Sequence, residues 1–340
     1  MAPNLPKTFK AALFKEANAP LVVEDVPLES PKHGEILIKV QASGVCHSDI
    51  MVQAGMMNSF PIIPGHETIG EIVAVGPDEK MWKVGDRAGG AWHGGHDGTC
   101  RECRRGHFQN CENEAINGVS RNGGYGEYAT LRSEAAVPIP KDVDAAAYAP
   151  LLCAGVTVFN SIRNMGIAPG QTVAIQGLGG LGHLALQFAA KMGYKVVALS
   201  SSASKQKFAK ELGAHVYLDG SKKDHVQALN EMGGAALVVC TAPNPELIGP
   251  LINAIQPRGK LLVLAPCGDI SINTVPLVVK GLSVHGWPSG ASLDSEETIE
   301  FAEVHGVNCL VEKFPLKDAA KAFQHMADNK ARFRAVIVME

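Results

Sequence analysis

The sequence predicts a two-domain α/β protein, in which a β-rich domain precedes a parallel sheet covered by helices. Three observations support this fold class. The chain has 340 residues, which is more than a single hydrophobic core usually serves. The first 150 residues contain short β-type runs separated by Gly and Pro. From about residue 172 onward, apolar strands alternate with amphipathic helices.

Four β-type runs define the first domain, at residues 10–14, 35–40, 70–75 and 125–131. Regularly spaced strands of this kind predict an antiparallel barrel or sandwich. A long loop at residues 89–122 shows no such periodicity. We therefore expect this loop to be held by something other than strand pairing, and a metal ion is a suitable candidate.

The second domain begins with a predicted strand at residues 172–175 and a helix at 184–192. The pattern continues with strands at 195–199, 216–218, 237–239 and 260–264, and with a helix at 205–212. Such alternation indicates βαβ units and a parallel sheet with helices on both faces.

Two further helices, at 295–304 and 317–329, and a final strand at 335–339 end the chain. We expect this tail to complete the first domain, which then comprises residues 1–152 and 290–340. The second domain comprises residues 153–289.

Composition excludes several classes of protein. A net charge of −3, with 46% hydrophobic and 19% charged residues, describes a globular chain without a basic surface for nucleic acid. Residues 1–7 lack the apolar core of a signal peptide, and the most apolar stretch, residues 145–159, is too short to span a bilayer. We expect a cytoplasmic protein that binds neither nucleic acid nor membrane. Its eight cysteines then indicate metal ligation, catalysis or burial rather than disulfides.

One cysteine cluster has the spacing of a zinc loop with a thiolate missing. The cysteines are Cys100, Cys103 and Cys111, and Asp97 stands where the same spacing would place a fourth. Aspartate also binds zinc and carries the same charge as a thiolate. Asp97 is therefore the favoured fourth ligand. A site completed by His96, and a loop without metal, stay open as alternatives.

A glycine-rich turn follows the strand at 172–175 and opens the next helix. Its sequence matches the dinucleotide-binding pattern GxGxxG, for which this strand–turn–helix context is the decisive support. The first glycine permits a tight turn, the second lets a pyrophosphate approach the helix N-terminus, and the third permits close packing. The predicted cofactor-binding residues of the turn are Gly177, Gly179, Gly180, Leu181 and Gly182.

The next strand ends without the acidic residue that usually binds the adenosine ribose of NAD. Ser200, Ser201 and then Lys205 stand there instead. Hydroxyls and an ammonium group suit a 2′-phosphate, so the sequence favours NADP. NAD remains the alternative, with Ser200 binding the unphosphorylated ribose.

Cys46, His66 and Cys153 form a second candidate metal set. Two thiolates and one imidazole are a known ligand set for catalytic zinc, which keeps a fourth position open for water or substrate.

Several motifs in this order resemble the zinc-dependent medium-chain alcohol dehydrogenases over essentially the whole chain. They are Gly44-Val45-Cys46-His47-Ser48-Asp49, Pro64-Gly65-His66-Glu67, Val84-Gly85-Asp86-Arg87, the cysteine loop, Gly123-Gly124-Tyr125-Gly126-Glu127-Tyr128, Leu151-Leu152-Cys153-Ala154-Gly155 and the glycine-rich turn. The resemblance implies a GroES-like β-barrel domain and a Rossmann domain, with the active site in the cleft between them. It also implies two zinc ions per chain, one catalytic and one structural, and NADP or NAD as cofactor.

The resemblance assigns roles around the catalytic zinc. Asp49 would accept the second ring N–H of His66, and Glu67 would lie close behind the metal. Ser48 would relay the alcohol proton to the cofactor ribose. Many relatives pass it on through a histidine five residues after the first cysteine, but Met51 occupies that position here.

Cofactor and substrate contacts follow from the same resemblance. His47 and Arg334 would contact the pyrophosphate, and Thr157 the nicotinamide. Trp92 would line the alcohol pocket, whereas Gln53 replaces a tryptophan found in some ethanol-preferring relatives. A wider pocket would favour medium-chain aliphatic or aromatic primary alcohols and aldehydes. Further wall candidates are Met56, Met57, Phe60 and Trp287.

Relatives are dimers or tetramers, so the resemblance also implies a homo-oligomer. Two rival functions stay open at this point. One is a zinc-free quinone or enoyl reductase of the same fold, and the other is a non-enzymatic scaffold that binds metal and nucleotide.

Overall fold

A computed structural model describes residues 5–339, which divide into two compact units. Unit 1 comprises the described parts of Met1–Val156, Ser289–Phe301 and Asn308–Glu340. Unit 2 comprises Thr157–Pro288 and Ala302–Val307. The predicted domains differ from these units by four residues at the first boundary and by one at the second, and residues 302–307 group with unit 2.

Unit 1 is built around a mainly antiparallel sheet. Its strands are β3 (Glu35–Gly44), β4 (Thr68–Val75), β5 (Arg87–Gly90), β8 (Tyr128–Arg132), β9 (Val137–Pro138), β16 (Val311–Pro315) and β17 (Arg334–Val338). Within residues 5–339 the order is β16-β17-β3-β4-β5-β9, and β8 also pairs with β3. Two small sheets pair β1 (Thr8–Leu13) with β2 (Val22–Pro27), and β6 (His93–Gly95) with β7 (Ala115–Ile116).

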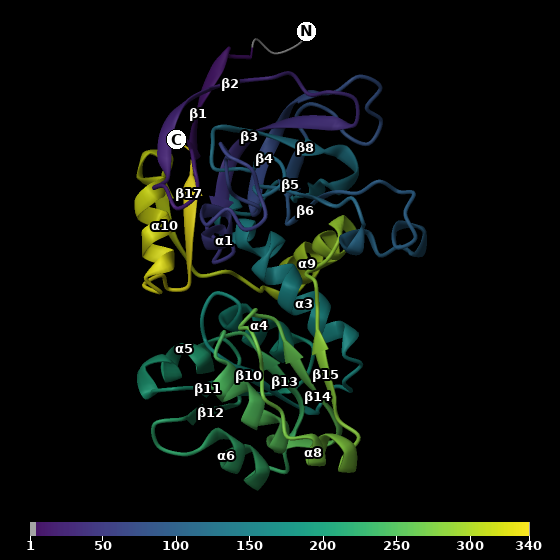
Figure 1. Cartoon of the computed structure of the whole chain (residues 1–340), viewed down its shortest axis with the longest axis vertical. Coiled ribbons are helices and arrows are strands. Elements are labelled where there is room, and N and C mark those ends of the chain that lie inside the picture. Colours follow the sequence, from purple (N-terminus) through teal and green to yellow (C-terminus); the bar gives the residue numbers. More distant parts are fainter. Residues whose placement is uncertain (1–4, 340) are drawn as a thin grey trace. The chain divides into compact units, whose positions relative to one another are not determined.

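The C-terminal strand closes unit 1. β17, the yellow strand close to the C-terminus in Figure 1, runs antiparallel to β3. In this pairing Val336 lies opposite Gly44. The alternating apolar residues of β3, including Ile36, Ile38 and Val40, are buried in the core of the sheet. Because β3 pairs with three other strands, residues close to its end are brought near both β4 and the end of the chain.

The helices that include residues of unit 1 are α1 (Asp49–Gln53), α2 (Ala145–Tyr148), α3 (Ala154–Asn164), α9 (Ser292–His305) and α10 (Ala319–Ala327). The helix α10 buries Ala319, Ala322, Phe323 and Met326, which share one face at helical spacing. Phe323 packs edge-on against Phe14, with ring centroids 5.5 Å apart. Among the described helices, none is by itself long and apolar enough to cross a membrane, although the bent pair Ala145–Leu152 and Ala154–Asn164 would pass that test together.

Unit 2 contains a parallel six-stranded sheet. Its strands are β10 (Thr172–Gln176), β11 (Lys195–Ser200), β12 (Val216–Asp219), β13 (Ala235–Cys240), β14 (Ile255–Val263) and β15 (Ser283–Gly286). Its helices are α4 (Gly182–Lys191), α5 (Gln206–Glu211), α6 (His225–Glu231), α7 (Pro245–Ile248) and α8 (Thr274–Val279). The described strands follow the order β12-β11-β10-β13-β14-β15, and every neighbouring pair is parallel.

This strand order is that of a doubly wound nucleotide-binding sheet. The order reverses between β10 and β13, and ligands of such sheets bind beyond the carboxyl ends of the strands at that point. All six residues of β13 are buried, as expected for a central strand covered on both faces. The strands and helices thus agree with the α/β class predicted from the sequence, a β-rich domain and a doubly wound parallel sheet.

Candidate metal centres and nucleotide site

The neighbouring strands β3 and β4 bring two of the predicted zinc ligands together. Cys46 follows β3, and His66 precedes β4 by one residue. Cys153 lies immediately before α3. One ligand atom from each of these residues, together with a carboxylate oxygen of Glu67, lies within 4.8 Å of all the others. The predicted catalytic ligands therefore converge in unit 1.

The chemistry of this donor set fits a zinc ion. His66 is completely buried, and Nε2 of its ring has no hydrogen-bond partner among the described residues. A buried polar atom without a partner is costly unless a ligand satisfies it. Nδ1 of His66 lies 3.5 Å from Oδ1 of Asp49, as predicted for a carboxylate that orients a metal-binding imidazole. Sγ of Cys46 and Sγ of Cys153 are 3.8 Å apart and not joined.

The protonation of the cluster is strongly coupled. A hydrogen bond from Cys153 lowers the pKa of Cys46 well below its ordinary value, and the same contact raises the pKa of Cys153. Burial alone would lower the pKa of His66, but the Cys46 thiolate and the Asp49 carboxylate raise it to about 9. Of the two thiols, that of Cys46 is therefore the one that ionises more readily.

Glu67 and Arg334 lie behind this cluster. Nη2 of Arg334 donates to Oε1 of Glu67, and both side chains are buried. Burial raises the pKa of Glu67 to about 7 despite Arg334. Gly44 is required here, because an added Cβ would overlap Oε2 of Glu67. The predicted contact of Arg334 with a pyrophosphate stays a prediction, since the structure shows this arginine bound to Glu67.

Other predicted residues surround the cluster. The ring of Trp92 meets that of His66 edge-on, with centroids 4.8 Å apart. Ser48 precedes α1, and its Oγ lies 3.6 Å from Sγ of Cys46. His47 is exposed, and Met51 is half-buried. Trp92 and Ser48 therefore lie beside two of the predicted zinc ligands, His66 and Cys46.

Gln53 has a partner that the sequence did not predict. Its side-chain Nε2 donates to the carbonyl of Ala19 at 2.9 Å. The backbone carbonyl of Gln53 accepts from the amide of Asn18. The structure thus uses Gln53 to hold the segment before β2, and its place in a substrate pocket stays a prediction. Trp287 belongs to unit 2, where its Nε1 is buried without a partner among the described residues.

The second metal set lies in the loop between β6 and β7. One ligand atom each from Asp97, Cys100, Cys103 and Cys111 lies within 4.8 Å of the other three. Oδ1 of Asp97 accepts from the amides of Thr99 and Cys100, at 2.7 and 2.9 Å. These amides, with the side-chain amide of Asn113, hold the pKa of Asp97 well below its usual range. Asp97 is therefore an anion whose carboxylate is held in place by three hydrogen-bond donors of the loop.

His96, the alternative fourth ligand, is engaged elsewhere. Its Nδ1 lies 3.1 Å from Nε2 of His93, and its ring stacks on Phe108 with centroids 4.2 Å apart. The other nitrogen of His93 contacts Glu114 at 3.2 Å. Geometry therefore favours Asp97 over His96 as the fourth donor.

The glycine-rich turn follows β10 at the reversal point of the parallel sheet. Gly177 has φ +88°, and an added Cβ would lie 2.6 Å from Cβ of Ala242. A Cβ on Gly182 would overlap the carbonyl of Gly177, whereas a Cβ on Gly179 would meet no protein atom within 4 Å. Gly177 therefore forms the tight turn, Gly182 allows the close packing, and Gly179 leaves open space for a ligand, as the sequence pattern predicted. Gly180 and Leu181 complete the turn before α4.

Residues beside this turn carry the predicted nucleotide contacts. Nζ of Lys205 donates to the carbonyl of Leu178 at 2.8 Å, which places the ammonium group at the glycine-rich turn. Ser200 is the last residue of β11, and Ser201 follows it on the surface. Thr157 is half-buried in α3.

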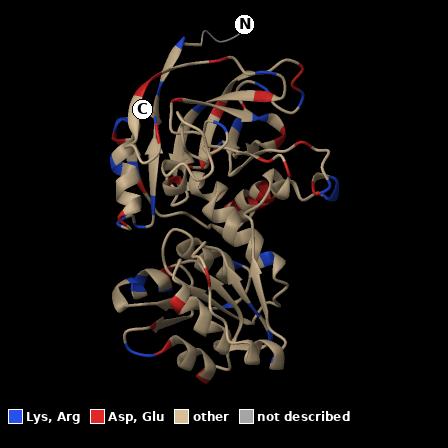
Figure 2. Ribbon diagram, viewed as in Figure 1, with Lys and Arg blue, Asp and Glu red and all other residues tan. Residues whose placement is uncertain are grey.

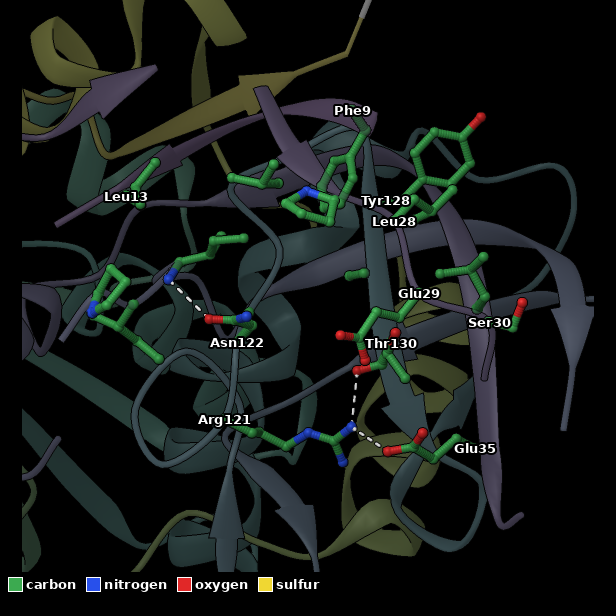
Figure 3. Close-up of a pocket in the computed structure, with 18 of the residues that line it drawn as sticks. Phe9, Leu13, Leu28, Glu29, Ser30, Glu35, Arg121, Asn122, Tyr128 and Thr130 are labelled. Atoms are coloured by element: carbon green, nitrogen blue, oxygen red, sulfur yellow. Dashed lines mark hydrogen bonds and ion pairs between the residues drawn. The ribbon is translucent and has the colours of Figure 1, made fainter. Parts of the chain in front are cut away.

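A cavity of about 410 Å³ lies elsewhere in unit 1 (Figure 3). Its apolar wall includes Phe9, Leu28 and Tyr128. One of its two cationic residues, Arg121, already donates to Glu35 and to the carbonyl of Thr130 (Figure 3). The cavity contains none of the predicted site residues, so its position says nothing about the chemistry of the metal set.

Sequence reasoning did not assign roles to three residues of the sites. Tyr125 donates to Asp49, Asn113 donates to Asp97, and Gly65 lies against the Tyr125 ring. The motif that contains Tyr125 was visible in the sequence. Its partner was not, because the two residues are 76 positions apart.

Comparison with known proteins identifies both halves of the chain. Residues 32–141 match the alcohol dehydrogenase GroES-like domain, and residues 180–304 match the zinc-binding dehydrogenase domain. An alcohol dehydrogenase of Penicillium expansum, patD, is 58% identical over 340 residues, covering 100% of both chains.

Two solved structures resemble the fold throughout. A cinnamyl alcohol dehydrogenase of Sorghum bicolor has a TM-score of 0.89 and 27% identity, covering 98% of each chain. An acetophenone reductase of Geotrichum candidum, solved in complex with NAD, has a TM-score of 0.86 at 27% identity, again covering 98% of each chain.

Proposed function

The chain belongs to the zinc-dependent alcohol dehydrogenases of the medium-chain superfamily, and we propose that it interconverts primary alcohols and aldehydes with NADP(H) preferred. As a member of this family it is an NAD(P)-dependent alcohol dehydrogenase that uses zinc. The predicted family, enzyme class and cofactor types are thereby confirmed. The substrate, the choice of nucleotide and the individual site residues are proposals.

One observation supports the catalytic proposal most directly: a ring nitrogen of buried His66 lies within 4.8 Å of ligand atoms of Cys46 and Cys153, and neither nitrogen of this ring has a hydrogen-bond partner among the described residues. When bound there, zinc supplies a Lewis acid for the reacting oxygen, and the nicotinamide accepts or supplies hydride. The two cysteine thiolates balance the charge of the cation. The carboxylate of Asp49 holds the His66 ring. The Ser48 hydroxyl would accept the alcohol proton at its Oγ while it passes its own proton on to the cofactor ribose, so that the serine stays neutral.

A preference for NADP(H) is supported by the end of β11. Ser200 and Ser201 supply hydroxyls there, and Lys205 holds its ammonium group at the glycine-rich turn. The carboxylate opposite Ser200 in the sheet register, that of Asp219, accepts from the amide and hydroxyl of Ser221. A 2′-phosphate would therefore meet donors on β11 rather than an acidic side chain.

We propose primary aliphatic and aromatic substrates of medium size rather than ethanol alone. Trp92 presents a flat apolar surface beside His66, and the second indole of some ethanol-preferring relatives is replaced by Gln53. The name of the Sorghum enzyme indicates a primary aromatic alcohol as substrate of that protein, whereas the name of the Geotrichum enzyme indicates an aromatic ketone. A substrate panel tests the proposal, and ethanol giving the highest kcat/KM would contradict it.

A structural zinc at Asp97, Cys100, Cys103 and Cys111 is the second metal site that we propose. Three thiolates and one carboxylate form a closed four-donor set, which is typical of a structural rather than a catalytic ion. The ion would stabilise a loop in which the described residues form only short 3₁₀ turns, Cys103–Arg105 and Phe108–Asn110, between β6 and β7.

We also propose that the enzyme is a cytoplasmic homo-oligomer, a dimer or a tetramer. β15 is an edge strand of the parallel sheet, and the adjacent α8 exposes Val275, Val278 and Val279 by 65–79%. Figure 2 shows α8 without acidic or basic residues. An apolar surface beside an unpaired strand edge suits a second copy of the chain.

Metal analysis combined with nucleotide-dependent turnover of one aldehyde tests the central proposal. We expect two zinc ions per chain and activity that a chelator abolishes. Activity without zinc would favour a quinone or enoyl reductase. Bound zinc and nucleotide without turnover of any aldehyde would favour a non-enzymatic scaffold.

A further inference from the structure

We propose that Tyr125 is a positioning residue of the catalytic centre, which fixes the Asp49 carboxylate and, through it, the ring of His66. This inference rests on the proposed zinc site at Cys46, His66 and Cys153. Tyr125, Asp49 and His66 are all completely buried, so their polar atoms satisfy one another or a bound ligand.

The hydroxyl of Tyr125 has one proton to donate. It lies 2.6 Å from Oδ2 of Asp49 and 3.3 Å from the carbonyl of Gly44, so the shorter contact identifies Asp49 as the acceptor. Oδ2 of Asp49 also accepts from the amide of Cys46 at 3.0 Å. Two donors, one of them on the backbone of a zinc ligand, therefore hold the same carboxylate oxygen.

The other carboxylate oxygen is left for His66. Oδ1 of Asp49 has no hydrogen-bond partner within the described part of the chain and lies 3.5 Å from Nδ1 of His66. Because Oδ2 is held on two sides, rotation of the carboxylate would break both of its hydrogen bonds. Oδ1 is thereby directed at the imidazole, whose other nitrogen is the predicted metal donor.

The ring of Tyr125 is placed independently of its hydroxyl. Its amide donates to the carbonyl of Pro64 at 3.0 Å, and its carbonyl accepts from Ala12 at 2.7 Å. The ring lies against Gly65, where an added Cβ would be 2.5 Å from Cδ1 of Tyr125. Gly65 has φ +102° and directly precedes the ligand His66. The tyrosine thus contacts the metal-binding segment through both its ring and its hydroxyl.

Tyr125→Phe tests this role because it removes the donor and keeps the ring. The measurement follows zinc release from the zinc-loaded full chain to a chelator. We expect the phase of release that accompanies loss of activity to become about tenfold faster, which is the effect typical of removing such an orienting group. The visible spectrum of the cobalt-substituted enzyme should also change. Tyr128→Phe, the same chemical change three residues away on β8, should leave both readouts unchanged.

A double-mutant cycle with Asp49→Asn checks that Tyr125 acts through Asp49. The two substitutions together should accelerate release scarcely more than Asp49→Asn alone. If loss of the hydroxyl volume prevents folding, p-methylphenylalanine at position 125 fills that volume without a donor, and p-aminophenylalanine should restore slow release by donating again.

The possible outcomes separate the inference from the function on which it rests. Wild-type enzyme without zinc at Cys46 would contradict the proposed function. Zinc-loaded, active wild type whose Tyr125→Phe variant releases zinc at the same rate, with the same cobalt spectrum, would overturn the role of Tyr125 alone. Full additivity in the cycle would likewise overturn it.

Discussion

Arg334 and Glu67 form a buried ion pair between residues 267 positions apart in the chain. Arg334 is the first residue of β17, and Glu67 directly follows His66, a proposed zinc ligand. The pairing of β17 with β3 brings the two together. The strand β17 is therefore part of the structure that holds the proposed metal ligands.

We expect Arg334→Ala to lower the free energy of unfolding by about 3–5 kcal/mol, because it leaves the Glu67 carboxylate buried without a counter-ion. Chemical denaturation of the zinc-loaded enzyme measures this loss. Arg332→Ala is the matched control, since Arg332 is exposed and donates to nearby carbonyls. Equal losses in the two variants would show that the ion pair has no special importance, and Glu67→Gln should partly rescue Arg334→Ala.

Asp97→Ala should reduce bound zinc from two ions per chain to about one and lower the melting temperature, with little effect on the chemical step. The substitution removes one of four donors from a site remote in role from catalysis. Asp97→Cys should keep both ions. Metal analysis and thermal unfolding decide the matter, with Glu112→Ala, an exposed acidic residue of the same loop, as the control. An Asp97→Ala enzyme with two zinc ions and unchanged stability would refute the assignment.

Ser200→Asp should shift the ratio of kcat/KM for NADPH to that for NADH toward NADH by about tenfold or more. A carboxylate at the end of β11 repels a 2′-phosphate and accepts hydrogen bonds from an unphosphorylated ribose. Asn230→Asp adds the same charge to an exposed position of α6 and should leave the ratio unchanged. A wild-type enzyme that already prefers NADH would remove the basis of the proposal.

Met51→His should add an ionisation near pH ~6.5 to the pH profile of kcat, because it introduces an imidazole at the relay position that this chain lacks. The wild-type profile should show no such histidine step. Steady-state kinetics between pH 5 and 9 supply the comparison, and Met51→Gln controls for the change in polarity. If rate and profile are the same in the histidine variant, the interpretation of Met51 loses its support.

Val278→Lys combined with Val279→Lys should convert the oligomer into monomers, because two ammonium groups would have to be buried at the interface. Light scattering during size-exclusion chromatography reports the mass of the particle directly. Val304→Lys alters an equally exposed valine on α9 and should not change the mass. A monomeric wild-type enzyme would show that the α8 surface has another role.

Local patterns carried much of the prediction. The strands at 172–175 and 195–199 were expected within one residue of β10 and β11, because apolar runs between turns are visible in the sequence. The glycine-rich turn could be predicted residue by residue, because each glycine of the pattern meets a different local requirement of the backbone. By contrast, β15 and the short strands β5, β6 and β9 were not anticipated, because strands of two to four residues carry too little periodicity.

The fold class, the residues of the two candidate metal sets and the glycine-rich turn could be predicted from residue type and from spacing along the chain. The contacts between distant groups could not: they are those of β17 with β3, Arg334 with Glu67, Tyr125 with Asp49, and His96 with His93 rather than with the cysteines. These partners are set by strand pairing and burial. A buried polar group forms hydrogen bonds with the groups that the fold places beside it. The residues next to it in the sequence do not reveal which groups these are.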